Sequence, residues 1–165
     1  MLQRAWLQIL LIPALAASFG SGPSIQAKIA QDKDKFERET DALHKAKDFE
    51  KLGDEQVNAF ARDAGGDQTD EGLEDLRDYR KEAHETYDSL KATGATAERK
   101  PEGYRQLQIH LRRGIWEIDR ALPAVPDELR TEVRTIRDDL ADLENRLIHE
   151  LFPSAARFWK QIPKG

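Results

Sequence analysis

The sequence predicts an all-α fold, an antiparallel bundle of about four long helices plus one short helix, preceded by a signal-peptide helix. Three observations predict the bundle. Large apolar residues recur at steps of three and four along most of the chain, which places them on one face of a helix. Glycine and proline stand at the ends of these periodic stretches. No stretch shows the pattern expected of a strand.

The longest periodic stretch spans residues 126–151. Pro126 suits the first helical position, and Asp127 and Glu128 place negative charge at the positive end of the helix dipole. Pro153 then ends the helix, because proline disfavours helical conformation in the preceding residue. The apolar seam of this helix consists of Leu129, Val133, Ile136, Leu140, Leu143, Leu147 and Leu151.

Two further long helices are predicted over residues 70–93 and 101–122. We expect Thr69 or Asp67 to cap the first of them and Gly94 to end it. The connections between these helices and the next are short, so neighbouring helices should lie antiparallel. The two seams consist of Leu73, Leu76, Tyr79, Ala83, Tyr87 and Leu90, and of Tyr104, Leu107, Leu111, Ile115, Ile118 and Leu122.

The region before these helices is predicted to contain one long and one short helix. Residues 28–52 carry a thin apolar stripe among many charges and are assigned to the long one. Gly53 fits a left-handed helix end and Asp54 fits the next N-cap, so the chain is expected to break there. The short helix then runs to Gly65 and Gly66.

The first 27 residues have the layout of a secretory signal peptide. Arg4 is followed by an apolar run from residue 5 to residue 17, and a less apolar stretch, residues 20–27, then ends in a small residue, Ala27. We expect cleavage after Ala27, with Ala16 or Ala17 as the alternative site. The run is shorter than the roughly 20 residues that span a bilayer. The mature chain should therefore be a soluble exported protein, periplasmic or extracellular, that meets the membrane only through its leader; an uncleaved interfacial anchor is the alternative.

Composition excludes several classes of function. The chain has a formal net charge of −5, and 35% of its residues are charged. An acidic balance without a basic stripe argues against nucleic-acid binding. There is no Cys, so the chain offers neither a disulfide nor a thiol nucleophile, and no Ser stands in a Gly-x-Ser-x-Gly elbow. These observations predict a protein that is not an enzyme.

Histidines and carboxylates are the candidate metal ligands in this sequence. His44, His84, His110 and His149 each fall beside a predicted seam, and we expect them to form hydrogen bonds at its edge. Di-metal bundles use Glu-x-x-His, and the nearest match here is residues 41–44, which begin with Asp. Residues 63–74 match an EF-hand loop only in part. No cofactor or metal is predicted; a bundle that binds a small ligand or metal remains the alternative function.

A partner-binding patch is the predicted functional feature. Ile109 and Trp116 stand seven residues apart, on the flank of the helix predicted over residues 101–122. The tail, residues 154–165, concentrates apolar rings in Phe158 and Trp159. We expect the tail either to dock beside Ile109 and Trp116 or to form a binding patch for another protein. The predicted domains are thus a signal peptide (1–27), a helical bundle (28–153) and an apolar tail (154–165).

Two resemblances accompany these patterns. Residues 104–113 and 145–153 look like segments of exported helical proteins of bacteria, which implies a bacterial, extracytoplasmic setting and no particular activity. Residues 60–79 resemble one tetratricopeptide hairpin, which implies an interaction surface, although no second copy follows at a spacing near 34 residues. Together they favour a non-enzymatic exported protein that acts through contact with another protein, as a scaffold or accessory subunit.

Overall fold

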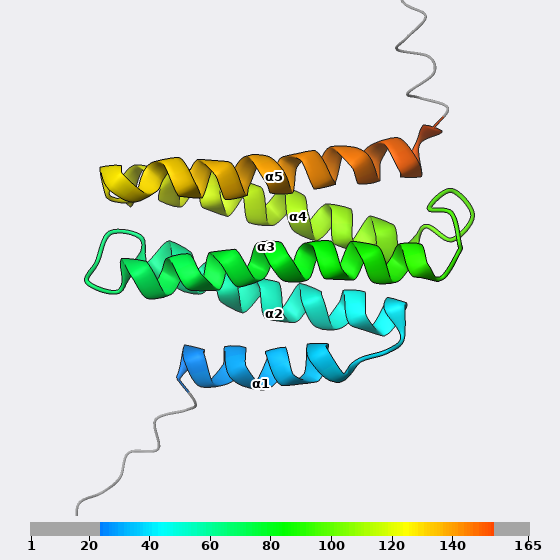
Figure 1. The fold of residues 1–165 in the computed structure, drawn as a ribbon, viewed down its shortest axis with the longest axis horizontal. Helices are drawn as coiled ribbons and strands as arrows, with labels where there is room; N and C mark the ends of the chain where they lie inside the picture. Colours follow the sequence, from blue (N-terminus) through cyan, green and yellow to red (C-terminus); the bar gives the residue numbers. More distant parts are fainter. Residues whose placement is uncertain (1–23, 154–165) are drawn as a thin grey trace, which may run out of the picture.

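The computed structural model describes residues 24–153, which form five α-helices and one short 3-10 helix, η1 (Figure 1). The described part of the chain contains no strand, so the all-α prediction is confirmed. The predicted signal peptide lies almost entirely outside the described residues. The elements are α1 (Ile25–Arg38), α2 (Ala42–Asp63), α3 (Thr69–Ala92), α4 (Glu102–Ala121), η1 (Leu122–Ala124) and α5 (Asp127–Leu151).

The four long helices pack as a bundle, and the short α1 lies at its edge (Figure 1). α2 packs along α3 and α4, α5 packs chiefly along α4, and α1 packs against α2. Between Ser24 and Pro153, no helix has both the length and the apolar character that crossing a membrane requires.

The predicted seams of α3, α4 and α5 form the core. Their side chains are buried, except that Leu122 and Leu129, at the ends of their helices, are only partly buried. Aromatic rings from α1, α2 and α3 join them: Phe49 lies 6.2 Å from Phe36 and 5.4 Å from Tyr79 between ring centroids. Burial of these apolar surfaces is the main stabilising contribution to the fold.

The predicted break at Gly53 is wrong. α2 runs without interruption from Ala42 to Asp63, and the chain turns instead between Arg38 and Asp41. The Asp41 carboxylate caps α2 by accepting hydrogen bonds from the backbone N–H groups of Leu43 (3.0 Å) and His44 (2.9 Å). The short helix of the bundle is therefore α1 (Figure 1).

Gly53 is needed for close packing rather than for a helix end. A Cβ atom added at this position would lie 2.5 Å from Nε2 of His110 and 2.7 Å from Cε2 of Tyr79. Both rings are buried and cannot move aside cheaply. Glycine at this point lets α2 approach α4 and the Tyr79 ring of α3.

The start of α3 also differs from the prediction, whereas its end agrees. The N-cap residue is Gln68, and no side chain caps the helix. The Thr69 hydroxyl is already inside the first turn and donates instead to the carbonyl oxygen of Gly66 (2.7 Å). Gly94 follows the end of α3 with φ of +71°, a left-handed conformation that favours glycine.

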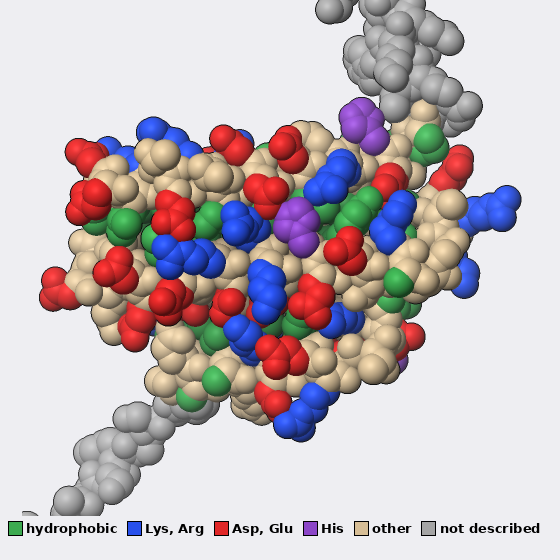
Figure 2. Space-filling view, viewed as in Figure 1, with side chains coloured by type: hydrophobic (Ala, Val, Ile, Leu, Met, Phe, Trp, Pro, Cys, Tyr) green, Lys and Arg blue, Asp and Glu red, His purple; other side chains and the backbone are tan. Residues whose placement is uncertain are grey.

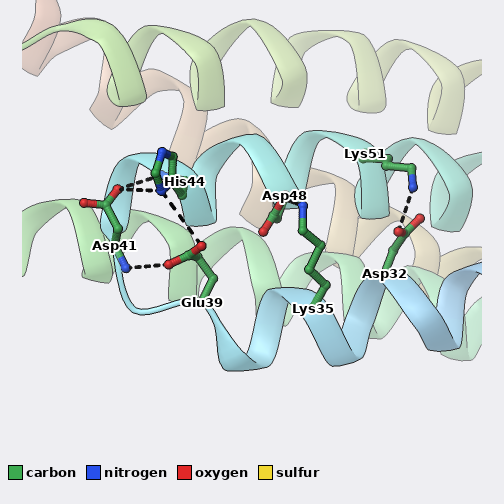
Figure 3. A network of polar contacts seen from close by, with 7 residues as sticks. All are labelled: Asp32, Lys35, Glu39, Asp41, His44, Asp48 and Lys51. Atoms are coloured by element: carbon green, nitrogen blue, oxygen red, sulfur yellow. Dashed lines mark hydrogen bonds and ion pairs between the residues drawn. The ribbon is translucent and has the colours of Figure 1, made fainter.

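α1 is attached by a thin apolar stripe and several ion pairs. Ile29 and Phe36 are buried against the bundle. Figure 3 shows two ion pairs that join α1 to α2, from Lys35 to Asp48 (2.5 Å) and from Lys51 to Asp32 (2.8 Å). The helix begins at Ile25, so the predicted cleavage after Ala27 falls within its first turn, whereas cleavage after Ala16 or Ala17 leaves it whole. The cleavage position remains a prediction.

We expect Asp41→Ala to lower the free energy of unfolding by about 1 kcal/mol, because it removes the N-cap of α2. Urea denaturation followed by circular dichroism measures the change. Asp41→Asn is the control, since asparagine caps helices as well as aspartate does. Equal losses in the two variants would show that the carboxylate charge, and not the cap, stabilises this turn.

Candidate interaction surface

The solvent-facing side of α4 exposes the apolar pair that the sequence predicted. Ile109 and Trp116 are each 56% exposed. Seven residues correspond to about two helical turns, so the two side chains lie on one face, roughly 10 Å apart along the axis. We define the α4 outer face by the exposed residues of this side: Arg105, Ile109, Arg112, Trp116 and Arg120.

Arginine side chains surround the two apolar residues. The Arg120 guanidinium lies over the Trp116 ring, 4.6 Å from its centroid. Arg112 donates from Nε to the Glu144 carboxylate of α5 at 2.9 Å. Cation–π stacking and ion pairing hold these long side chains in place, which reduces the entropy they would lose when a partner binds.

An open groove of about 720 Å³ lies beside the outer face. α2 forms one wall, and the start of α4 with the preceding loop forms the other. Ile109 belongs to both the groove and the outer face, so the two are continuous. The groove is lined by Leu43, Lys47, Glu50, Lys100, Pro101, Glu102, Arg105, Gln106 and Ile109.

Polar contacts hold the groove walls together. The Gln106 side-chain amide donates to the Glu50 carboxylate at 2.7 Å, and the Lys47 ammonium lies 3.8 Å from the Glu102 carboxylate. Leu43 and Pro101 are partly buried and supply apolar surface. The groove thus offers apolar contacts flanked by charges of both signs.

A second, smaller hollow of about 240 Å³ lies between α2 and α4 and contains His110 in its lining. Burial, together with the nearby charge of Arg113, lowers the pKa of His110 to about 3. The ring is therefore neutral at neutral pH, with Nδ1 3.1 Å from the Arg113 guanidinium. Burial raises the pKa of Asp54, although Arg113 opposes the shift.

Two buried polar atoms near this hollow have no hydrogen-bond partner, Nε2 of His110 and the hydroxyl of Tyr79. Neither opens toward a ligand. The Gly53 geometry shows that Nε2 faces the α2 backbone, and the hydroxyl lies against Gly114, where an added Cβ would collide with it. Neither of these two atoms therefore faces the hollow.

The histidines do not assemble a metal site. His44 and His149 are exposed, His84 lies 2.7 Å from Asp139, and His110 is buried alone among aromatic rings. Across residues 24–153, no group of three or more His, Cys, Asp or Glu side chains could hold a metal ion. In residues 63–74, which match an EF-hand loop only in part, the Asp63 carboxylate accepts two hydrogen bonds from Arg62.

The face formed by α3 and α5 differs from the α4 outer face. Figure 2 shows positive and negative side chains interleaved across the side of the bundle that contains these helices. Arg77 of α3 forms a two-pronged pair with Glu132 of α5, at 2.7 and 3.0 Å. Neutralised, evenly charged surfaces of this kind lack the apolar anchors on which protein interfaces depend.

Of the predicted site residues, the structure describes two. It places Ile109 and Trp116 on one exposed face, whereas Phe158 and Trp159 lie outside the described residues. Sequence reasoning missed the arginines of the outer face and the groove wall from α2. The repeat of arginine at residues 105, 112 and 120, flanking the apolar pair at helical spacing, was the available signal.

No family model, curated protein or solved structure matches the chain. The resemblances to exported bacterial proteins and to a tetratricopeptide hairpin therefore remain expectations. Any functional conclusion must come from the surface itself.

Proposed function

We propose that this chain is a non-enzymatic exported protein that acts through contact with another protein, as a scaffold or accessory subunit, and that the α4 outer face makes the contact. The exposed Trp116 and Ile109 among arginines are the observation that carries the proposal. Tryptophan and arginine are the residue types most enriched among those that dominate binding energy at protein interfaces. Export rests on the predicted leader.

The small hollow around His110 supports the alternative, a ligand-binding function, less strongly than the α4 outer face supports contact with a protein. Its buried imidazole is neutral, and Nε2 faces the backbone of α2 rather than the hollow. A ligand entering it would meet the guanidinium of Arg113 already paired to Asp54 at 2.7 Å. Breaking that pair would cost part of the binding energy.

The test is a pull-down from the exported fraction of the source cells with the purified protein as bait. We expect one protein to be recovered in stoichiometric amount, and Trp116→Ala to weaken its binding by about thirty-fold, which corresponds to the roughly 2 kcal/mol lost at an interface hot spot. Isothermal titration of the recovered protein measures this change.

Phe152→Ala is the matched control. Phe152 is 49% exposed and is the C-cap residue of α5, so it is not one of the residues of the α4 outer face. Nonspecific hydrophobic binding would weaken equally in the Trp116→Ala and Phe152→Ala variants. Such an equal loss would contradict the proposal. Recovery of a small molecule or ion without any protein would also contradict it.

A further inference from the structure

The groove and the α4 outer face together form a continuous surface of apolar and charged side chains, with no occupant among the described residues. Three large apolar side chains of residues 24–153 are exposed, and two of them, Ile109 and Trp116, belong to this surface. The third, Phe152, stands at the point where the tail begins. The segment that follows Phe152, residues 154–165, is therefore the candidate occupant of this surface.

The tail begins at the end of the bundle where the groove opens. Figure 1 shows the end of α5 and the loop before α4 at the same end of the bundle. Glu150, in the last turn of α5, accepts a hydrogen bond from the Tyr87 hydroxyl at 2.6 Å and lines a common hollow with loop residues 94–98. Lys100 and Pro101 of the same loop form the mouth of the groove.

The tail is long enough to cover the whole surface. Residues 154–165 span up to about 40 Å when extended, at about 3.3 Å per residue. The distance along α4 from Glu102 to Trp116 is about 21 Å at 1.5 Å per residue. This leaves chain enough to pass from the end of α5 across to α4.

The side chains of the tail suit a mixed groove. Phe158, Trp159 and Ile162 supply apolar groups. Three basic residues lie between or beside them and can meet the groove carboxylates of Glu50 and Glu102. Because the groove also carries cations, apolar contact rather than net charge should dominate the interaction. The basic residues of the tail are Arg157, Lys160 and Lys164.

We propose that the tail, residues 154–165, docks in the α2–α4 groove and along the α4 outer face of its own chain, and so acts as a built-in competitor for the contact surface. The competing role rests on the proposed function, whereas docking itself does not. Tethering favours the intrachain contact, because it gives the tail an effective concentration in the millimolar range. A protein partner must displace the tail before it binds.

A spin label on the tail tests docking in the full chain. The protein has no cysteine, so Lys164→Cys provides a single attachment site for a nitroxide. We expect the label to remove the backbone amide NMR signals of groove residues such as Lys47 and Arg105. Signals of Lys28 in α1, which lies outside the groove and the outer face, should persist.

Paired tail variants provide the control. Replacing Phe158 and Trp159 together with alanine should restore the groove signals, whereas Gln161→Ala should not. Uniform broadening, or none, in the labelled protein would overturn docking. Broadening seen only when labelled and isotope-enriched copies are mixed would overturn the intrachain form, since the tail would then occupy a second copy.

The two proposals can fail separately, because the labelling experiment contains no partner. Groove broadening without any recovered partner would leave docking standing and remove the proposed function. Recovery of a partner whose binding depends on Trp116, without broadening of the groove signals, would support the proposed function and remove docking of the tail.

Discussion

Replacing Gly53 with alanine is expected to lower the free energy of unfolding by about 3 kcal/mol, the upper end of what overpacking costs in a well-packed core. Glycine to alanine in a helix interior ordinarily stabilises by about 1 kcal/mol. Here the sign should reverse, because the new methyl group would overlap Nε2 of His110 and Cε2 of Tyr79. Relief requires shifting α2 away from α4, and the core side chains between them would lose contacts.

Urea unfolding followed by circular dichroism measures the effect. Gly66→Ala is the matched control: its added methyl group would meet only the Asp63 carbonyl oxygen, at 3.9 Å, and the residue is exposed. Its stability should stay within about 0.5 kcal/mol of the original chain. If Gly53→Ala proves as stable as that control, the close approach of the helices at this point is not what requires glycine.

Gly53 also shows why the sequence misplaced a helix boundary. A glycine followed by aspartate is the usual signature of one helix ending and another starting. A glycine is also required inside a helix where another side chain packs directly against the helix backbone. At Gly53 these side chains are the rings of Tyr79 and His110, which lie far along the chain. The residues next to Gly53 in the sequence do not predict these distant contacts.

The seams, in contrast, could be predicted because each helix needs only its own periodicity to define its buried face. Ile109 and Trp116 fell outside the α4 seam in the sequence, and the structure exposes them both. The groove beside them could not be predicted. Its second wall comes from Leu43 and Lys47, and placing that wall requires knowing that α2 packs against α4.

The burial of Glu82 is another feature that the apolar periodicity of the sequence does not predict. It follows Arg80 and Lys81 in a charged stretch and stands just outside the Tyr79–Ala83 seam. Yet it is only 2% exposed, and it accepts a hydrogen bond from the buried Gln56 side chain at 2.8 Å. Its burial depends on packing between α2 and α3, with Lys33 of α1 beside it, which the sequence alone does not specify.

The buried Glu82 carboxyl should make the stability of the protein depend on pH. Burial raises its pKa to about 7, although the Gln56 hydrogen bond and the charge of Lys33 oppose the shift. Asp78 and Glu85 add to the rise. The Lys33 ammonium is 3.7 Å from Glu82 but only 2.5 Å from Asp78, so its charge is shared.

The sign follows from proton binding. At pH values between 4.5, the ordinary pKa of a glutamate, and about 7, Glu82 is protonated in the folded state and ionised in the unfolded state. Its contribution to stability is therefore fully present below about pH 4.5 and is lost as pH rises to about 7. His110 acts in the opposite sense between about pH 3 and 6.5, because there only the unfolded state binds its proton.

Glu82→Gln should isolate this effect. The glutamine amide keeps the shape of the side chain and can still accept the Gln56 hydrogen bond, but it never ionises. The stability of the variant relative to the original chain should therefore rise by about 3 kcal/mol between pH 4 and pH 8, which is about 2.5 pKa units at 1.36 kcal/mol each. The opposing His110 contribution is common to both proteins and cancels in the difference.

Urea denaturation at pH 4, 6 and 8 gives the three differences needed. Glu74→Gln, which removes an exposed carboxyl from the same helix, corrects for the loss of one negative charge. A Glu82→Gln difference that is the same at all three pH values would mean that Glu82 has the same pKa in the folded and unfolded protein, so that burial does not raise it. The charge of Lys33 would then have to offset the effect of burial on the Glu82 carboxyl. In that case Lys33→Met should destabilise the original chain far more than it destabilises the Glu82→Gln variant.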